Sequence, residues 1–258
     1  MTEEYVTEAE YQNLFTTLKR AEVAGLLQVG KKVLDVATGS GYFAIEIARH
    51  YPHVHITGID IFTGSIDQAN INVAKIGLEE RIHFIRMDAC ELEFPDNYFD
   101  TVVNYLGFED IYMTRGFNGV VRAMREVYRV LKPDGRFYFV AMPVDEMDTQ
   151  PQKLEVEVFS WICNADWLTS TEYLTILSCA GFAFNAKTSF LTGKKLTSAQ
   201  AKKEIKYACL NVPIDYRVDS RSFQDTWNKF GSLIEKHGMG HYSKTVLFEM
   251  FKPSKILG

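Results

Sequence analysis

Short apolar runs alternate with segments of helical spacing from about residue 31 onward. The apolar runs predict strands at 32–37, 55–60, 82–88, 99–105 and 136–142. Between them, apolar side chains recur every three or four positions and predict helices at 42–50, 63–76 and 119–131. Strands that alternate with helices of this length are typical of a parallel sheet with helices on both faces.

The last third of the chain has a different order of elements. Thr169 and Glu172 fit a capping box and predict a helix to residue 180, and apolar runs at 182–191 and 244–251 predict two more strands. The stretch between those strands has helical patterns, one of them capped by Thr197 and Gln200. The pattern predicts an α/β, Rossmann-like, doubly wound seven-strand sheet with its last strand antiparallel and a helical insertion between the last two strands.

We interpret residues 1–258 as one domain, because the charged break at 143–153 is soon followed by aromatic residues and predicts a crossover loop and helix. Its expected parts are an N-terminal helical cover at 1–29, a core at 30–142, and the insertion at 192–242, which we expect to act as a substrate lid. A homodimer stays open, since the amphipathic helix of the insertion could pack on a second subunit instead.

Composition and charge narrow the class of protein. Of the 258 residues 47% are hydrophobic and 24% are charged, which excludes disorder, collagen and a disulfide scaffold. The net charge of -5 argues against a nucleic-acid partner held by charge. No apolar run approaches the roughly 18 residues of a membrane span. The acidic first ten residues lack an apolar signal region, so we expect a cytoplasmic protein.

Neither disulfides nor a metal site are expected. The four cysteines form no CxxC pair, so we expect free thiols in a reducing compartment. His237 and His241 stand four residues apart, but Gly238 and Gly240 lie between them and no third ligand is near.

Acidic residues and glycines follow the predicted strands, at the edge where parallel sheets bind ligands. After the first strand, Gly39 and Gly41 lack the Cβ atoms that would keep a ligand from the backbone, and the next helix begins there with free N–H groups. Asp60 ends the second strand, where a carboxylate can accept both ribose hydroxyls of an adenosine. Asp88 ends the third strand and suits the exocyclic amine of an adenine.

Charge decides which nucleoside cofactor fits this edge best. The spacing Gly39-x-Gly41-x-x-Ala44 alone also matches a dinucleotide fingerprint. A pyrophosphate there would lie about 4–6 Å from Asp35, which is repulsive by roughly 1 kcal/mol or more. S-adenosylmethionine carries a sulfonium and an α-ammonium instead, and Asp35 would attract both. A nicotinamide-dependent oxidoreductase remains the alternative.

Four segments resemble, in order and spacing, the class I S-adenosylmethionine-dependent methyltransferases: VLDVATGSGYFAIEIA, TGIDIFTGSIDQA, IRMDACELEFPDNYFDTVVN and REVYRVLKPDGRFYF. The resemblance runs continuously over 31–142 and is greatest to the small-molecule, ubiquinone/menaquinone-biosynthesis-like branch. It implies in-line transfer of a methyl group from S-adenosylmethionine to a small-molecule acceptor, giving S-adenosylhomocysteine. A non-catalytic S-adenosylmethionine-binding partner protein is a second alternative.

The resemblance also implies individual roles at the carboxyl edge of the sheet. The expected cofactor contacts are Asp35, Ala37, Gly39 and Gly41 at the methionine end, Asn104 and Tyr105 beside the transferred methyl, Asp60 at the ribose, Ile61 against the adenine, and Asp88 with Ala89 at the adenine edge. Ala37 stands where the family usually has the first glycine of its run. Tyr11, together with Tyr5, could close over the cofactor or simply pack a covering helix.

The acceptor side of the reaction is less defined by the sequence. A general base is needed only if the acceptor must lose a proton before attack. Glu109 and Asp110, after the fourth strand, could act as base or bind a cationic acceptor, or could lie in a solvated loop. His241, near the end of the insertion, could also reach in as a base or stand on the surface.

Overall fold

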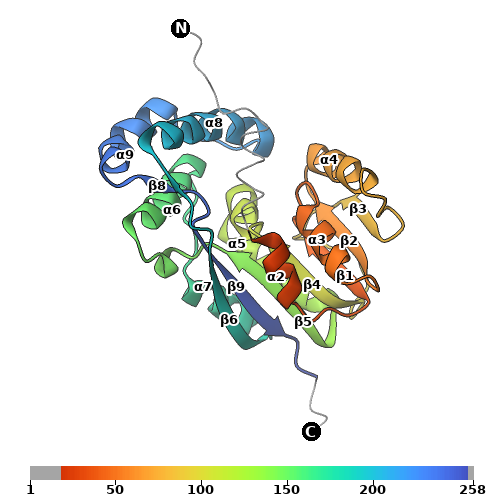
Figure 1. Cartoon of the computed structure of the whole chain (residues 1–258). Coiled ribbons are helices and arrows are strands. Elements are labelled where there is room, and N and C mark those ends of the chain that lie inside the picture. The colour runs from red at the N-terminus through yellow and green to blue at the C-terminus, as the bar shows by residue number, and fades with distance from the viewer. Residues whose placement is uncertain (1–18, 255–258) are drawn as a thin grey trace. The chain divides into compact units, whose positions relative to one another are not determined.

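The computed structural model describes residues 19–254 and contains the predicted seven-stranded sheet. The strand order is β3-β2-β1-β4-β5-β9-β6, and the last strand, β9, is antiparallel (Figure 1). The pairs β1–β2, β1–β4, β2–β3 and β4–β5 are parallel. The strands are β1 (Lys32–Val36), β2 (His55–Asp60), β3 (Ile82–Arg86), β4 (Phe99–Tyr105), β5 (Leu131–Ala141), β6 (Ala183–Leu191) and β9 (Lys244–Phe251). The α/β, doubly wound fold class is therefore confirmed.

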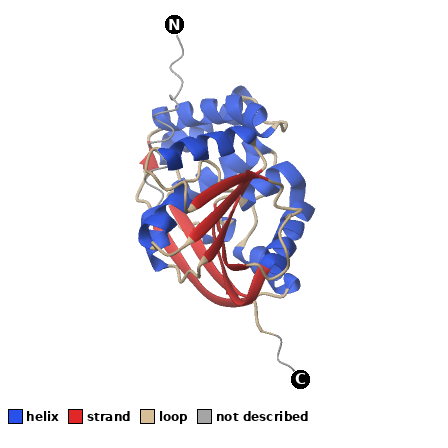
Figure 2. Cartoon of the chain, turned by 90° about the vertical axis from the view of Figure 1, so that its right-hand side faces the viewer, coloured by secondary structure: helices blue, strands red, loops and turns tan. Residues whose placement is uncertain are grey.

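The chain forms two compact units. The first, called here the sheet unit, comprises 20–141, 171–188 and 247–254 of the described residues. Its helices are α2 (Arg20–Leu26), α3 (Tyr42–His50), α4 (Thr63–Ala74), α5 (Phe108–Val130) and α7 (Ser170–Ala180). Figure 2 shows helices on both faces of the sheet. The inner strands are largely buried, as expected for a sheet covered on both sides, and Leu34, Val102 and Phe139 are fully buried. The edge strands β3 and β6 are mostly exposed.

The second unit, called here the helical unit, comprises Lys19, 142–170 and 189–246 of the described residues. Its elements are η1 (Val144–Glu146), α6 (Gln150–Cys163), β7 (Lys195–Leu196), α8 (Ser198–Tyr216), α9 (Phe223–His237) and β8 (Met239–Gly240). It has a hydrophobic core of its own, to which α6 contributes Leu154 and Val158, α8 contributes Ile205, and α9 contributes Phe230 and Ile234. The single-domain interpretation and its boundaries stay predictions.

Several helices and strands begin or end at residues other than those predicted, for identifiable reasons. The capping box at Thr197 and Gln200 is confirmed, and α3 has the predicted bounds. Helix α5 begins at Phe108 instead of about residue 119, and a kink at Gly116, with φ 66°, interrupts its periodicity. Strand β5 begins at Leu131 instead of residue 136, and residues 132–135 form a register shift in its pairing between Phe99 and Thr101. The β7–β8 ribbon was not predicted, because two residues per strand carry no pattern.

Three further features concern the chain as a whole. None of the four cysteines is paired in a disulfide. Among residues 19–254, no helix combines the length and apolar character needed to cross a bilayer. Within the same range, no group of three His, Cys, Asp or Glu side chains is arranged to hold a metal ion.

Candidate cofactor site

Asp35 lies at the carboxyl end of β1 and is only 1% exposed. Its Oδ2 atom accepts a hydrogen bond from the Thr38 hydroxyl at 2.6 Å. Its Oδ1 atom is buried and has no hydrogen-bond partner among the described residues. Burial raises the pKa of the Asp35 carboxyl to about 7, the charge of Asp60 adds to this, and the Thr38 hydroxyl and Arg20 oppose it. The site thus contains a buried oxygen that a cationic ligand could satisfy.

The turn after β1 lies at the carboxyl edge of the sheet. Gly41 has φ 77° and caps α3 without a side-chain hydrogen bond. In the first turn of this helix, the Ala44 N–H donates to the Asp35 carboxyl and lowers its pKa. A Cβ atom on Gly41 would lie 2.6 Å from Cζ of Phe84, so a side chain has no room there. A Cβ atom on Gly39 would meet nothing within 4 Å, which leaves that side of the turn open to a ligand.

Asp60 connects the end of β2 to this turn. Its Oδ2 accepts the Gly39 N–H at 2.9 Å, and its Oδ1 accepts the Phe62 N–H at 2.9 Å. Burial raises the pKa of the Asp60 carboxyl, and the same backbone donors partly offset the rise. Each carboxylate oxygen has a second lone pair, so the group can hold the turn and still accept hydroxyl donors from a ligand. This geometry suits the ribose role that the resemblance implies.

Asp88 lies just beyond β3 and has protein partners for both oxygens. Its Oδ1 accepts the Cys90 N–H at 2.9 Å, and its Oδ2 pairs with the Arg115 guanidinium at 3.0 Å. Burial opposes ionisation, but the Cys90 N–H and Arg115 together lower the pKa of the Asp88 carboxyl below its ordinary value. Ala89 is buried and Ile61 is half-buried. Their contacts with adenine stay predictions.

The end of β4 contributes Tyr105 and Asn104. Tyr105 is 8% exposed, and its ring packs 4.8 Å from that of Phe43. Asn104 is fully buried: its Nδ2 donates to the Val36 carbonyl at 2.7 Å, and its Oδ1 accepts the Gly107 N–H at 3.2 Å. The side-chain amide of Asn104 therefore bonds to the protein backbone at both ends. Its expected place beside the transferred methyl stays a prediction.

Arg20 is a residue of this site that sequence reasoning missed. It begins α2, and its guanidinium lies 5.2 Å from the Tyr105 ring centroid and 5.8 Å from that of Tyr42. Its charge also lowers the pKa of Asp35. The only sequence signal was a lone arginine in the expected N-terminal cover, which carries no motif.

The acceptor-side candidates of the sheet unit begin a helix. Glu109 and Asp110 are in the first turn of α5, where the helix dipole favours negative charge. Glu109 is 7% exposed and forms a hydrogen bond with the hydroxyl of Tyr173 on α7. Burial raises the pKa of Tyr173 well above its ordinary value, and the charge of Glu109 adds to this. Tyr5 and Tyr11, predicted near the cofactor, lie outside the described residues.

His241 lies in the helical unit and is buried, with 1% of its side chain exposed. Its Nδ1 is 3.4 Å from Oε2 of Glu204, whose side chain is 3% exposed. Burial lowers the pKa of His241 to about 3, and the charge of Lys194 adds to this. Burial also raises the pKa of Glu204 to about 7, against the effect of Lys194. The imidazole is therefore neutral near pH 7, and its expected role as a base stays a prediction.

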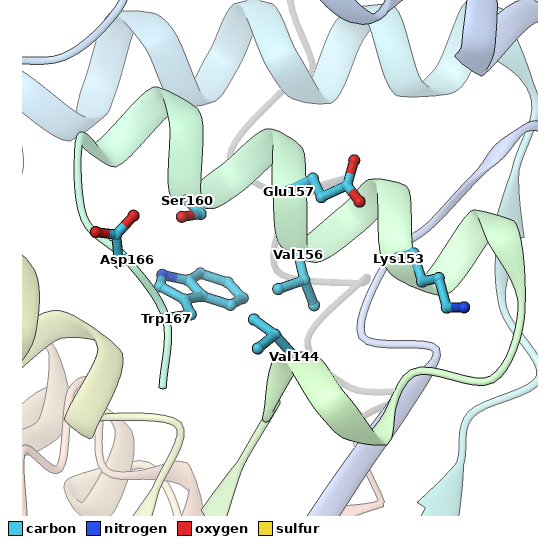
Figure 3. Close-up of a pocket in the computed structure, with 7 residues that line it drawn as sticks. All are labelled: Val144, Lys153, Val156, Glu157, Ser160, Asp166 and Trp167. Carbon is cyan, nitrogen blue, oxygen red and sulfur yellow. The ribbon is translucent and has the colours of Figure 1, made fainter. Parts of the chain in front are cut away.

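A cavity of about 240 Å³ lies in the helical unit. Figure 3 shows the Trp167 indole beside Val144 and Val156, with the Ser160 hydroxyl above the ring. Charged side chains, Lys153, Glu157 and Asp166, complete the lining. All of these residues belong to the crossover at 143–170, and none comes from the insertion expected to form the lid.

The geometry of the sheet unit agrees with comparison to known proteins. Residues 33–135 match a family model described as a methyltransferase domain. This segment, less than half of the chain, is therefore similar to the methyltransferase domains that the family model describes.

Over 132 residues, the chain is 33% identical to a demethylmenaquinone methyltransferase of Bacteroides fragilis, and the match covers 51% of each protein. It is 30% identical over 181 residues to a sterol 24-C-methyltransferase of Neurospora crassa, covering 66% of this chain and 45% of that one. The chain thus matches only about half the length of these curated relatives. The solved structure of the YcgJ protein from Bacillus subtilis shares the fold, with a TM-score of 0.62 at 20% identity, covering 95% of this chain and 99% of that one.

Proposed function

We propose that this protein transfers a methyl group from S-adenosylmethionine to a small-molecule acceptor. The observation that carries the proposal is the buried Oδ1 atom of Asp35, which has no hydrogen-bond partner among the described residues. An unpaired buried carboxylate oxygen costs free energy until a cation or donor satisfies it. The α-ammonium of S-adenosylmethionine supplies both a positive charge and N–H donors.

The other groups of the crevice complement the remaining parts of the same molecule. Arg20 provides a guanidinium for the carboxylate of the methionine moiety, since Arg and a carboxylate pair in a bidentate manner. Asp60 accepts the ribose hydroxyls while it holds the Gly39 N–H. The pyrophosphate of a nicotinamide dinucleotide would instead bring negative charge toward Asp35 and Asp60, both buried acids.

Bound S-adenosylmethionine supplies an electrophilic methyl on a good leaving group, so positioning contributes much of the rate. In this chain, Tyr105 would lie beside the bound cofactor at the end of β4, with its ring packed against Phe43. Glu109 would face the acceptor from the first turn of α5, either binding a cationic group or accepting a proton, with Tyr173 orienting its carboxyl. The relatives' names concern a quinone and a sterol, which makes hydrophobic acceptors the first to test.

Calorimetry with S-adenosylhomocysteine tests the cofactor assignment. We expect micromolar binding in the full chain and its loss in Asp60→Ala, since that change removes the ribose acceptor. NADH is the competing ligand, and binding of NADH alone would end the proposal. Catalysis is then tested by mass spectrometry of small molecules after incubation with a labelled methyl donor. Cofactor binding without transfer to any metabolite would favour the non-catalytic binding protein.

The helical unit is proposed to select the acceptor. Its 240 Å³ cavity is lined by the apolar side chains of Trp167 and Val156 and by charged groups (Figure 3). Trp167→Ala should change the acceptor preference while leaving S-adenosylhomocysteine affinity within about twofold of the parent. If the ranking of acceptors is unchanged, neither this cavity nor the crossover that lines it determines acceptor preference.

A further inference from the structure

Two residues at the carboxyl edge of the sheet have a backbone conformation that L-amino acids avoid. Ala37 has φ 52° and Leu106 has φ 58°, and neither is a glycine. For an alanine this left-handed conformation carries a population penalty of roughly fivefold to thirtyfold. A glycine at position 37 would adopt it without that penalty. The alanine therefore needs neighbours that fix the backbone at this point.

The side chain of Asn104 provides such a restraint on Ala37. Its Nδ2 donates to the Val36 carbonyl at 2.7 Å, and this carbonyl belongs to the peptide plane that links Val36 to Ala37. The orientation of that plane sets φ of Ala37 directly. Rotation of the plane would turn the carbonyl away from Asn104 and leave a buried amide without its acceptor.

Close packing on the other side of Asn104 makes the arrangement specific. The Gly107 N–H donates to Oδ1 of Asn104 at 3.2 Å. A Cβ atom on Gly107 would lie 2.5 Å from Nδ2 of Asn104 and 2.6 Å from Cβ of Ala37. The two partners also fix the orientation of the amide group, because a carbonyl requires the donor end and an N–H requires the acceptor end.

We propose that Asn104 is a positioning residue, which holds the 36–37 peptide plane so that the turn from Ala37 to Gly41 is preset for the cofactor. The inference rests on the proposed cofactor site but assigns Asn104 no contact with the cofactor. The turn that it holds carries the Thr38 N–H, which donates to Ile59, and the Gly39 N–H, which donates to Asp60. If Asn104 no longer held the 36–37 peptide plane, the segment that carries the Gly39 N–H, which donates to Asp60, would therefore be disturbed.

A double-mutant cycle between Asn104→Ala and Ala37→Gly tests the proposal with S-adenosylhomocysteine affinity as readout. We expect Asn104→Ala to weaken binding about tenfold or more in the parent, and the affinity of Ala37→Gly alone is the reference for the double variant. The double variant should bind within about threefold of Ala37→Gly, because glycine keeps the positive φ without the amide. A double variant as weak as Asn104→Ala would overturn the proposal, since a residue that contacts the cofactor cannot be rescued in this way.

Asn72→Ala is the matched control. Asn72 on α4 also donates its amide to a carbonyl of the same turn, Ser40, at 3.0 Å. The residues on either side of Ser40 are glycines, so this bond restrains no left-handed alanine. Ala37→Gly should therefore not restore any affinity that Asn72→Ala loses. Equal rescue of both variants would mean that glycine at 37 helps binding in general, and would count against Asn104.

Hydrogen exchange in the ligand-free protein gives a second readout. The peptide that spans 36–41 should exchange faster in Asn104→Ala and return toward the parent rate in the double variant. If Asn104→Ala does not fold, Asn104→Asp retains the acceptor for Gly107 but places an oxygen against the Val36 carbonyl, and the same loss and rescue are expected. Absence of S-adenosylhomocysteine binding in the parent protein would refute the proposed function, whereas parent binding with an additive cycle would refute only the role of Asn104.

Discussion

Replacing Asp35 by asparagine should make the ligand-free protein more stable at alkaline pH while removing cofactor binding. Burial raises the pKa of this carboxyl from 3.8 to about 7, so the folded protein holds its proton more tightly than the unfolded chain. The free-energy cost of ionising Asp35 in the folded protein appears as the pH rises above about 4, and it reaches its full value above pH 7. A shift of about three pKa units corresponds to about 4 kcal/mol at pH 8, and to under half of that at pH 5.

Asparagine has the same shape, does not ionise, and can still accept the Thr38 hydroxyl through its carbonyl oxygen. Urea unfolding of the parent and Asp35→Asn at pH 5 and pH 8 measures the difference. We expect the variant's advantage to grow by about 3 kcal/mol between these values, and S-adenosylhomocysteine binding to be lost at both. An advantage that is independent of pH, or a variant less stable than the parent at pH 8, would refute the assignment of a raised pKa to Asp35.

Three further predictions concern the same crevice. S-adenosylhomocysteine affinity should rise between pH 5.5 and pH 7.5, because only ionised Asp35 attracts the ammonium. Calorimetry in buffers of different ionisation enthalpy should detect the proton released on binding, and an affinity that does not change with pH would contradict this prediction. Arg20→Ala should weaken binding about tenfold and shift the midpoint of this pH profile upward, since Arg20 lowers the pKa of Asp35. Weaker binding with an unchanged midpoint would mean that Arg20 binds the ligand but does not influence the pKa of Asp35. Gly41→Ala should destabilise the protein by about 1–3 kcal/mol and reduce binding, because its Cβ would meet Phe84 at 2.6 Å, and thermal unfolding with and without ligand is the check.

The fold was predictable because its signals are local. The apolar runs and the spacing at 42–50 and 55–60 describe α3 and β2 with the bounds that the structure has. Asp35, Asp60 and Asp88 were singled out because each lies at or just beyond the end of a strand, and their contacts with a cofactor stay predictions. By contrast, Glu109 was expected on a loop, because residues after Phe108 lack a clear helical period up to the kink at Gly116.

Contacts between distant parts of the sequence could not be predicted in the same way. Nothing near Arg20 marks it as a neighbour of Tyr105, because that contact depends on where α2 packs. The burial of His241 depends on Glu204, 37 residues earlier on α8. The two backbone bonds of Asn104 depend on the turn conformations at Ala37 and Leu106, which a residue pattern does not encode. Local patterns therefore pointed to the proposed site, whereas the residues that pack around it depend on tertiary contacts.

The interleaving of the two units has an evolutionary consequence. Of the described residues, the helical unit contains Lys19 and two long stretches, 142–170 and 189–246, while the family match at 33–135 lies entirely in the sheet unit. A recombination event would have to replace both stretches together to exchange the helical unit and keep its core intact. Point mutations in it can accumulate without altering Asp35 or Asp60. Under the proposed division of roles, descendants of this chain would change acceptors by gradual substitution in the helical unit while the sheet unit keeps its cofactor site.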